Sequence, residues 1–225
     1  MKSVIPNMLT SLNLVLGMGS IISTFQGSFY QAAILVVLAM VADGLDGRVA
    51  RFFNASSEFG KELDSLCDLV SFGVAPAILA YAFYLKDFSA VGYVAAIAFA
   101  TCGALRLARF NVNTTVVKGY FMGLPIPAGG CVLATFIMLD IKPDGIIFPL
   151  MVLIFGYLMV SKVKYPDFKG KGEKIRILPS IIAIALGAYI LFSRLDAILF
   201  VPFIVYSVFG ILNTLFGLFE AKTVK

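Results

Sequence analysis

Four aspartates with helical spacing are the residues of this chain best suited to chemistry. Asp43 and Asp46 lie three positions apart, and Asp64 and Asp68 lie four apart. At 3.6 residues per turn, each pair shares one face of a helix. The short link near residues 54–57 makes the two helices antiparallel neighbours, so we expect the four carboxylates to converge. Without compensation, such like charges would repel one another and take up protons.

Divalent cations would compensate these carboxylates. Ligand sets made only of oxygen suit hard cations such as Mg²⁺ or Mn²⁺, so we predict two such ions as cofactors. Two bridged ions can hold both the attacking and the leaving oxygen of a phosphoryl displacement. The sequence contains no histidine, which removes the commonest general base and leaves acid–base chemistry to carboxylates. The three cysteines match no zinc or haem spacing and are interpreted as packing residues.

Membrane-spanning helices must position these aspartates. Of the 225 residues, 60% are hydrophobic and only 14% are charged, and several apolar runs reach the roughly 18 residues that a membrane crossing needs. We therefore predict an all-α fold, a polytopic membrane bundle forming one domain. The predicted transmembrane helices, about eight in number, cover residues 4–25, 29–53, 57–84, 88–111, 125–140, 145–162, 176–193 and 196–219.

The basic residues predict how this bundle is oriented. Eight crossings place both termini on one side, and every Lys and Arg except Lys86, Lys142 and Arg194 falls on that side. Because basic loops stay in the cytoplasm, we predict that both termini and the four aspartates face the cytoplasm of a cell membrane. Ionisable groups in such a frame are costly and indicate function. Cation pathways also use them, so a divalent-cation transporter is the alternative from another functional class.

The residues around the aspartates form a longer pattern of fixed spacing. It reads D-G-x2-A-R-x8-G-x3-D-x3-D from Asp46 to Asp68, with a further aspartate three residues before it. Glycines let a bulky ligand approach the backbone, and an arginine can pair with phosphate oxygens. The pattern resembles the signature of the CDP-alcohol phosphatidyltransferase family. The matching positions are Asp43, Asp46, Gly47, Ala50, Arg51, Gly60, Asp64 and Asp68.

This resemblance implies roles for the matching residues. It implies that Asp43, Asp46 and Asp64 bind metal, while Asp68 is the general base and also a metal ligand. It further implies a site for the CDP part of the substrate next to the aspartates. The residues expected at this CDP site are Asn7, Thr10, Gly47, Ala50, Arg51 and Gly60.

The first helix and the domain organisation carry further implications of the resemblance. Asn7 and Thr10 lie on the first turn of the first helix, where capping explains them equally well from the residues alone. The P-N-x-x-T opening, however, resembles the one that the family places beside the CDP pyrophosphate. The resemblance also implies a homodimer and a six-helix catalytic core at residues 1–162. Residues 163–225 would add a basic cytoplasmic loop and two more transmembrane helices.

A second group of residues resembles one branch of this family. The segments R-x-A-R-F-N-V from Arg106 and G-L-P-x-P from Gly123, together with the helix 1 opening, resemble the phosphatidylserine synthase branch. The branch implies transfer of a phosphatidyl group from CDP-diacylglycerol to L-serine at the lipid bilayer, with no nucleic acid involved. Arginines can hold the serine carboxylate and neutral side chains its ammonium. The predicted acceptor residues are Asn13, Arg106, Arg109, Asn111 and Lys118.

Charge alone does not select serine as the acceptor. Glycerol 3-phosphate or an inositol phosphate would also bind two arginines, so the same chemistry with another acceptor stays open. A pair of arginines at a membrane surface also anchors a helix without any ligand.

Overall fold

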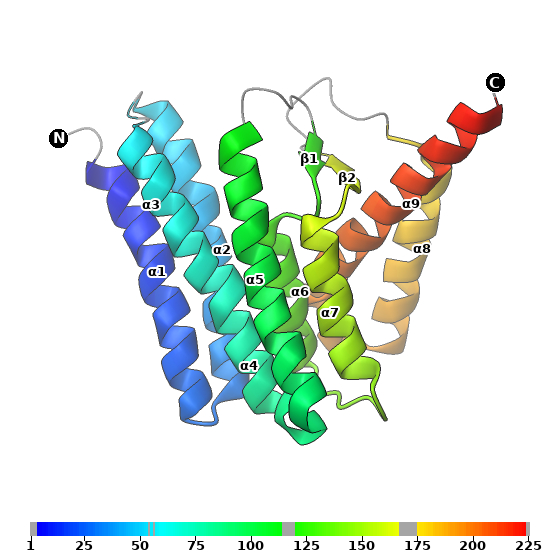
Figure 1. The fold of residues 1–225 in the computed structure, drawn as a ribbon, viewed down its shortest axis with the longest axis horizontal. Coiled ribbons are helices and arrows are strands. Elements are labelled where there is room, and N and C mark those ends of the chain that lie inside the picture. The colour runs from blue at the N-terminus through cyan, green and yellow to red at the C-terminus, as the bar shows by residue number, and fades with distance from the viewer. Residues whose placement is uncertain (1–3, 54, 56, 114–119, 167–174, 224–225) are drawn as a thin grey trace.

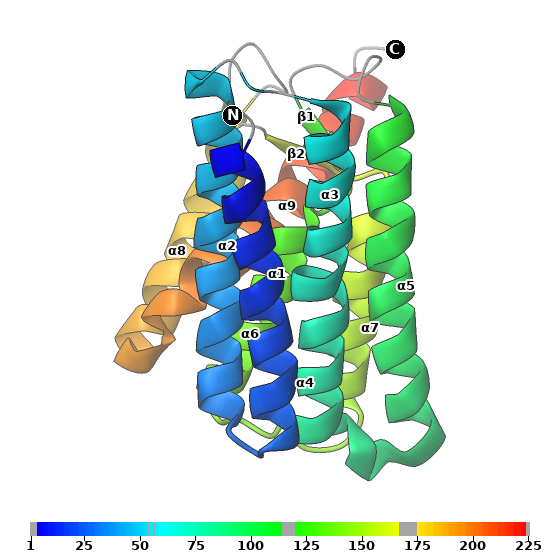
Figure 2. The same cartoon turned by 90° about the vertical axis from the view of Figure 1, so that its left-hand side faces the viewer.

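The computed structural model describes residues 4–53, 55, 57–113, 120–166 and 175–223. These residues form a bundle of helices that run up and down side by side, as Figures 1 and 2 show. The first elements are α1 (Val4–Phe25), α2 (Phe29–Phe52), α3 (Glu58–Asp68), a π-helical segment (Leu69–Val74), α4 (Ala75–Phe83) and α5 (Ser89–Asn113). The later elements are β1 (Tyr120–Met122), α6 (Ile126–Met138), α7 (Ile147–Val160), β2 (Lys164–Pro166), α8 (Ile177–Ser193) and α9 (Val201–Thr223).

Each of the predicted helices corresponds to a helical part of the structure. The third prediction, residues 57–84, covers α3, the π-helical segment and α4, which follow one another without a break. The last prediction, residues 196–219, covers a 3₁₀ turn at Leu195–Leu199 and then α9. Two short strands were not predicted: β1 pairs antiparallel with β2, and Phe121 lies opposite Tyr165.

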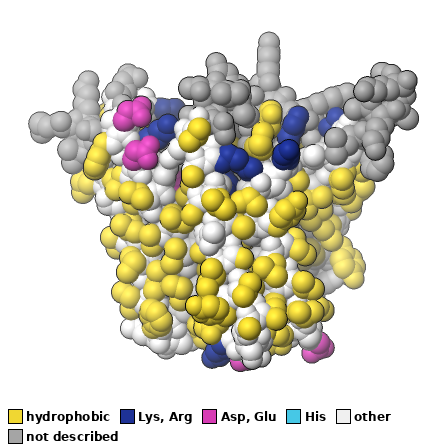
Figure 3. Space-filling view, viewed as in Figure 1, with side chains coloured by type: hydrophobic (Ala, Val, Ile, Leu, Met, Phe, Trp, Pro, Cys, Tyr) yellow, Lys and Arg dark blue, Asp and Glu magenta, His cyan; other side chains and the backbone are white. Residues whose placement is uncertain are grey.

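The helices have the length and surface of a membrane protein. Within the described residues, the segments Ile5–Phe25, Glu58–Phe83 and Leu85–Val112 are long and apolar enough to cross a membrane, while α6 to α9 are shorter apolar helices. Large hydrophobic side chains are exposed on the outside of the bundle, where Figure 3 shows them between the charged side chains of the upper and lower ends. Such a surface suits lipid and would be unfavourable in water. The number of crossings stays a prediction.

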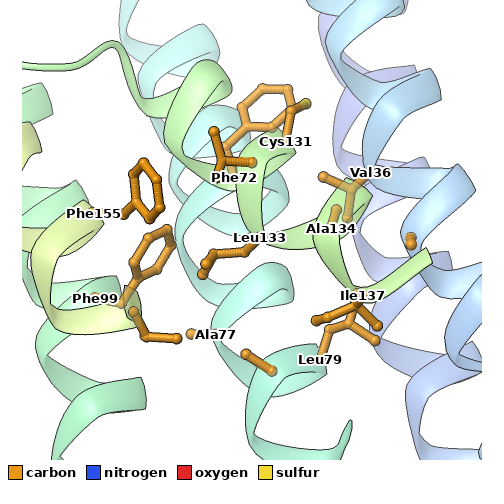
Figure 4. Packing of buried hydrophobic residues seen from close by; sticks show 14 of the residues in the cluster. Val36, Phe72, Ala77, Leu79, Phe99, Cys131, Leu133, Ala134, Ile137 and Phe155 are labelled. Atoms are coloured by element: carbon orange, nitrogen blue, oxygen red, sulfur yellow. The ribbon is translucent and has the colours of Figure 1, made fainter. Parts of the chain in front are cut away.

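The helix α6 lies at the centre of the hydrophobic core. Its Leu133 is completely buried, and Figure 4 shows this side chain among Val36 of α2, Phe72 of the π-helical segment and Phe99 of α5. Gly130 permits the close approach of α6 to the π-helical segment, because a Cβ there would lie 2.7 Å from the Phe72 carbonyl oxygen. This packing fixes the height and rotation of the π-helical segment, which directly follows Asp68.

The strand β2 fastens α9 to the bundle. Tyr165 is completely buried, and its ring lies so close to Gly210 of α9 that a Cβ would not fit between them. Its hydroxyl donates to the Ser207 carbonyl (3.3 Å), and the Tyr206 hydroxyl donates to the Pro166 carbonyl (3.1 Å). Burial raises the pKa of Tyr165, so the phenol stays a donor. The helix α8 in turn packs on α9, on the right-hand side of the bundle in Figure 1.

Candidate functional site

Three chain segments form the site at one end of the bundle. There α1 begins, α2 ends and α3 begins, as Figure 2 shows. Ser57 has an extended backbone conformation and caps α3, since its Oγ accepts a hydrogen bond from the Gly60 N–H at 3.0 Å. An N-cap of this kind supplies a partner for an N–H that the helix itself cannot satisfy. The cap fixes where α3 begins and therefore where its aspartates face.

The structure brings the four predicted aspartates together, though in unequal surroundings. Carboxylate oxygens of Asp43, Asp64 and Asp68 lie within 4.8 Å of one another. Asp46 lies to the side of this cluster, where its Oδ2 accepts a hydrogen bond from Thr10 Oγ1 at 2.6 Å. Asp46 and Asp68 are the most buried of the four, with 6% and 7% of their surface exposed. The helical spacing thus correctly predicted that the carboxylates of Asp43, Asp64 and Asp68 converge.

The carboxylate cluster fits a divalent cation. Asp64 Oδ1 is buried and has no hydrogen-bond partner among the described residues. Leaving such an oxygen unpaired costs about 1–3 kcal/mol, and a bound cation would remove that cost together with the repulsion between the carboxylates. Oxygen ligands of this kind are those that Mg²⁺ and Mn²⁺ prefer. The residues present are therefore compatible with the predicted metal site.

A pocket of about 210 Å³ lies beside the cluster, and Asp46 and Asp64 line it. Gly60 keeps part of the pocket open, because a Cβ there would lie 3.2 Å from both Asn7 Oδ1 and Ser57 Oγ. The residues predicted for the CDP site all line this one pocket: Asn7, Thr10, Gly47, Ala50, Arg51 and Gly60. The structure therefore gathers the six residues from α1, α2 and α3, while the ligand that they bind stays a prediction.

Sequence reasoning missed Lys61, which also lines the pocket. It follows Gly60 directly and lies three positions before Asp64, so it occupies the same end of α3 as the signature residues. This position beside the signature residues is the feature of the sequence that could have identified Lys61. A lone lysine near a membrane surface is more often an anchor for the helix, which is why spacing alone did not identify it.

Two of the predicted acceptor residues lie next to the aspartates. Asn13 is completely buried, and its Nδ2 donates to Asp68 Oδ1 at 2.9 Å. Arg106 is only 6% exposed, and its guanidinium lies 5.2 Å from the centre of the Phe110 ring. It is close enough to Asp68 and Asp43 to interact with them electrostatically. Within the described part of the chain, no hydrogen bond to this guanidinium is present.

The other predicted acceptor residues have different surroundings. Asn111 Nδ2 donates to Ser65 Oγ at 3.0 Å and so joins α5 to α3. Arg109 donates to four backbone carbonyls at 2.7–3.2 Å, those of Met122, Met159, Val160 and Ser161. These bonds tie α5 to the end of β1 and to the last turn of α7. Lys118 lies outside the described residues.

The helix α9 reaches toward this part of the site. Tyr206 lies close enough to Arg106 for an electrostatic interaction, and Tyr165 holds the same stretch of α9 in place. From the sequence, α9 is predicted to be one of two helices added to a six-helix core. The electrostatic interaction between Tyr206 and Arg106 could not be predicted, because residues 106 and 206 share no local pattern.

Comparison with known proteins gives a consistent result. The profile of the CDP-alcohol phosphatidyltransferase family matches residues 3–208. The CDP-diacylglycerol–serine O-phosphatidyltransferase of Helicobacter pylori (strain ATCC 700392 / 26695) is 37% identical over 218 residues, covering 94% of this chain and 91% of the relative. A protein of the same name from Methanocaldococcus jannaschii is 38% identical over 213 residues, 95% of each chain. The archaetidylserine synthase of Methanothermobacter thermautotrophicus is 39% identical over 170 residues, 75% of this chain and 72% of the relative.

Proposed function

Because this chain belongs to the CDP-alcohol phosphatidyltransferase family, we propose that it transfers the phosphatidyl group of CDP-diacylglycerol to L-serine and releases CMP. One observation carries the proposal: the pocket lined by the six expected CDP residues also contains Asp64 of the carboxylate cluster. A nucleotide diphosphate bound there would have its phosphates beside the carboxylates. The names of the three relatives described above include serine, which supports serine as the acceptor.

Divalent metals belong to this proposal as cofactors. The family generally depends on them, and Asp43, Asp64 and Asp68 provide a suitable oxygen cluster. We propose two ions, Mg²⁺ or Mn²⁺, held by these three residues and Asp46. When bound, the ions would supply neutralisation of the negative charge that develops on the phosphoryl oxygens and on the leaving group.

The pocket residues bind and orient the nucleotide end of the lipid. Arg51 and Lys61 are the cations that line the pocket, and both pair with pyrophosphate oxygens in this mechanism. The hydrogen bond from Thr10 holds the Asp46 carboxylate in one orientation. Asn7 and Gly60, which nearly touch, border the nucleotide. The acyl chains stay in the bilayer, against the exposed apolar faces of the helices.

Asp68 acts as the general base in this mechanism. It takes the proton from the serine hydroxyl while that oxygen forms a bond to the β-phosphorus, and the bond from this phosphorus to the CMP oxygen breaks. The buried position of Asp68 keeps bulk water away from the carboxylate. No residue of the chain has to become phosphatidylated in this scheme.

Arg106 is the residue that we assign to the serine carboxylate. Buried donors are almost always hydrogen-bonded in proteins, and this buried guanidinium makes no hydrogen bond within the described residues. A carboxylate would provide two parallel bonds, the strongest arrangement available to arginine. The charge of Arg106 would also draw the acceptor toward Asp68, with which it interacts electrostatically.

The orientation and assembly complete the proposal. Figure 3 shows Lys and Arg side chains mainly near the end where α1 begins, which supports an active site facing the cytoplasm of a cell membrane. With the start of α1 and the end of α9 at this same end (Figure 1), both termini would be cytoplasmic. A homodimer is proposed on the family resemblance alone.

An acceptor comparison tests the proposed function. The protein is purified in detergent, supplied with CDP-diacylglycerol and Mg²⁺ or Mn²⁺, and CMP release is measured with L-serine, glycerol 3-phosphate, inositol phosphate or no acceptor. Among these acceptors, we expect only L-serine to give CMP release, with phosphatidylserine as the product. Release with glycerol 3-phosphate but not with serine would reject the acceptor.

The same preparation tests the general base and the transport alternative. Asp68→Asn is expected to bind CDP-diacylglycerol but to lose turnover, because asparagine cannot accept the hydroxyl proton. Near-normal turnover would remove Asp68 from this role.

A divalent-cation transporter would instead move metal into liposomes without any nucleotide lipid, and we expect no such flux.

A further inference from the structure

A side chain from another helix holds the carboxylate of Asp68. Asn13 lies on α1, and its Nδ2 donates to Asp68 Oδ1 at 2.9 Å. The backbone carbonyl of the same asparagine accepts a hydrogen bond from Ser71 Oγ, also at 2.9 Å. All three residues are buried. Asn13 of α1 therefore donates one hydrogen bond to Asp68, at the end of α3, and accepts another from Ser71, three positions later in the π-helical segment.

The backbones of α1 and the π-helical segment lie in direct contact at this point. Gly17, one turn after Asn13 on α1, has no side chain to separate them, and a Cβ there would lie 2.8 Å from Ser71 Cα. The short distance lets the short serine side chain reach the Asn13 carbonyl. Ser71 thus sets the height of Asn13 relative to Asp68.

The hydrogen bonds lie where the third helix changes its form. Residues Leu69–Val74 are π-helical and begin immediately after Asp68. Segments of π-helix inside α-helices are rare and frequently occur at functional sites. A carboxylate at such a junction benefits from an external partner, and the Asn13 amide supplies one.

The amide oxygen of Asn13 indicates that the residue serves at this position as a hydrogen-bond donor to Asp68. Asn13 Oδ1 is buried and has no hydrogen-bond partner among the described residues. An unpaired buried oxygen is unfavourable, so an apolar side chain would suit packing better at this position. The residue is also completely buried, which fits a contact with Asp68 better than the predicted contact with serine.

We infer that Asn13 is a positioning residue, whose amide holds Asp68 Oδ1 and so directs Oδ2 toward the serine hydroxyl, and that Ser71 acts through Asn13. This inference rests on the proposed function, because it takes Asp68 as the general base. Small displacements of a catalytic group are expensive: an error of about 1 Å can cost about 100-fold in rate. Loss of the amide should therefore reduce turnover more than substrate binding.

Replacement of Asn13 by a side chain of similar size tests the inference. In detergent, with saturating Mg²⁺ or Mn²⁺, kcat and the KM values for serine and CDP-diacylglycerol are measured for Asn13→Leu and Asn13→Asp. We expect kcat to fall about 10–100-fold in both, with both KM values within about twofold of the parent. Asn13→Asp keeps the shape of asparagine but replaces the donor by an acceptor.

The matched control is Ser20→Ala. Ser20 lies on the same helix, is also completely buried, and its hydroxyl has no hydrogen-bond partner among the described residues. We expect kcat of this variant to equal that of the parent. Thermal melting in detergent checks that each variant is folded.

A double variant tests the part assigned to Ser71. Because its hydroxyl acts through Asn13, Ser71→Ala should lower kcat severalfold, whereas Asn13→Leu/Ser71→Ala should be no slower than Asn13→Leu alone. If the decrease in kcat of the double variant equals the product of the two single decreases, Ser71 does not act through Asn13. If Asn13→Leu does not fold, Asn13→Asp and Ser71→Ala decide the question.

The outcomes separate this inference from the function on which it rests. A folded Asn13→Leu protein with kcat within twofold of the parent would overturn the positioning role, and so would a raised KM for serine at unchanged kcat, which would make Asn13 a substrate ligand. A parent protein that releases no CMP with any acceptor would reject the proposed function itself. Activity with a different acceptor leads to the same kcat comparison with that acceptor.

Discussion

At the scale of single residues, the four aspartates differ in what satisfies their oxygens. Thr10 donates to Asp46 and Asn13 donates to Asp68, whereas Asp64 Oδ1 is buried without a partner within the described residues. A bound cation would therefore stabilise the Asp64 carboxylate most directly, because its buried oxygen has no other partner within the described residues. The signature spacing treats these residues alike, and only their neighbours in space distinguish them.

Asp64→Asn should weaken the binding of the metal on which activity depends. We expect the half-saturating Mg²⁺ concentration to rise about tenfold or more, since even residues that only support metal ligands change affinity 10–100-fold. Activity is measured over a Mg²⁺ series, with Glu62→Gln as the control because it removes the same charge from an exposed position on the same helix. An unchanged titration would count against Asp64 as a ligand.

Arg106 and Arg109 should respond oppositely to substitution. Arg106→Gln is expected to raise the KM for serine about 10–100-fold, because a hydrogen bond to a charged group contributes about 1.5–3 kcal/mol. Arg109→Gln is expected to lower the melting temperature instead, because four backbone carbonyls lose their donor. Measuring both quantities for both variants checks the assignment. A serine KM that rises only in Arg109→Gln would reverse the two roles.

At the scale of secondary-structure elements, the attachment of α9 is the main addition to the predicted arrangement. The ring of Tyr165 fills the space that the absent side chain of Gly210 leaves free. This contact brings α9 near the core, where Tyr206 interacts electrostatically with Arg106. The strands β1 and β2 are only three residues each, too short for an alternating pattern to reveal.

Gly210→Ala should loosen this attachment. The added methyl group overlaps the buried Tyr165 ring, and overpacking of this kind destabilises a protein by about 1–3 kcal/mol. We expect a lower melting temperature in detergent. Gly19→Ala is the control, because a Cβ there meets only the end of the Leu35 side chain at 3.4 Å. Equal melting temperatures for the two variants would contradict the importance of the contact.

At the scale of the whole molecule, charge and hydrophobicity are divided along the bundle axis. The exposed apolar side chains cover its middle, and the catalytic candidates lie at the end where α1 begins. Substrates of the proposed reaction match this division, since the acyl chains are apolar while CDP and serine are polar. The proposed active site would therefore lie where the apolar and the polar surroundings of the bundle meet.

Cysteine labelling in intact cells should establish the orientation. A membrane-impermeant maleimide is expected to label Asp144→Cys, in the exposed link before α7, from outside, and to label Glu58→Cys, at the exposed start of α3, only after permeabilisation. Basic loops retained in the cytoplasm are the physical reason. The parent chain gives the background from its own cysteines, of which Cys67 and Cys131 are buried. The opposite labelling pattern would mean an inverted protein.

The sequence by itself determined the helical membrane class, the positions of the helices and the family. These features depend on local quantities: the hydrophobicity of consecutive residues, the helical period and the fixed spacing from Asp43 to Asp68. The same spacing correctly predicted that three of the four carboxylates converge, because residues three or four apart share a helix face. The family is confirmed by its profile and by the similar proteins.

The tertiary structure alone decided which partner each polar side chain has. Asn13 meets Asp68 across 55 positions of chain, and Arg109 meets Val160 across 51. No local period links such residues, because their contact depends on how several helices pack around α6. For this reason the residues predicted to bind the acceptor as a group proved to have separate surroundings, with Arg106 beside the aspartates and Arg109 bound to backbone carbonyls.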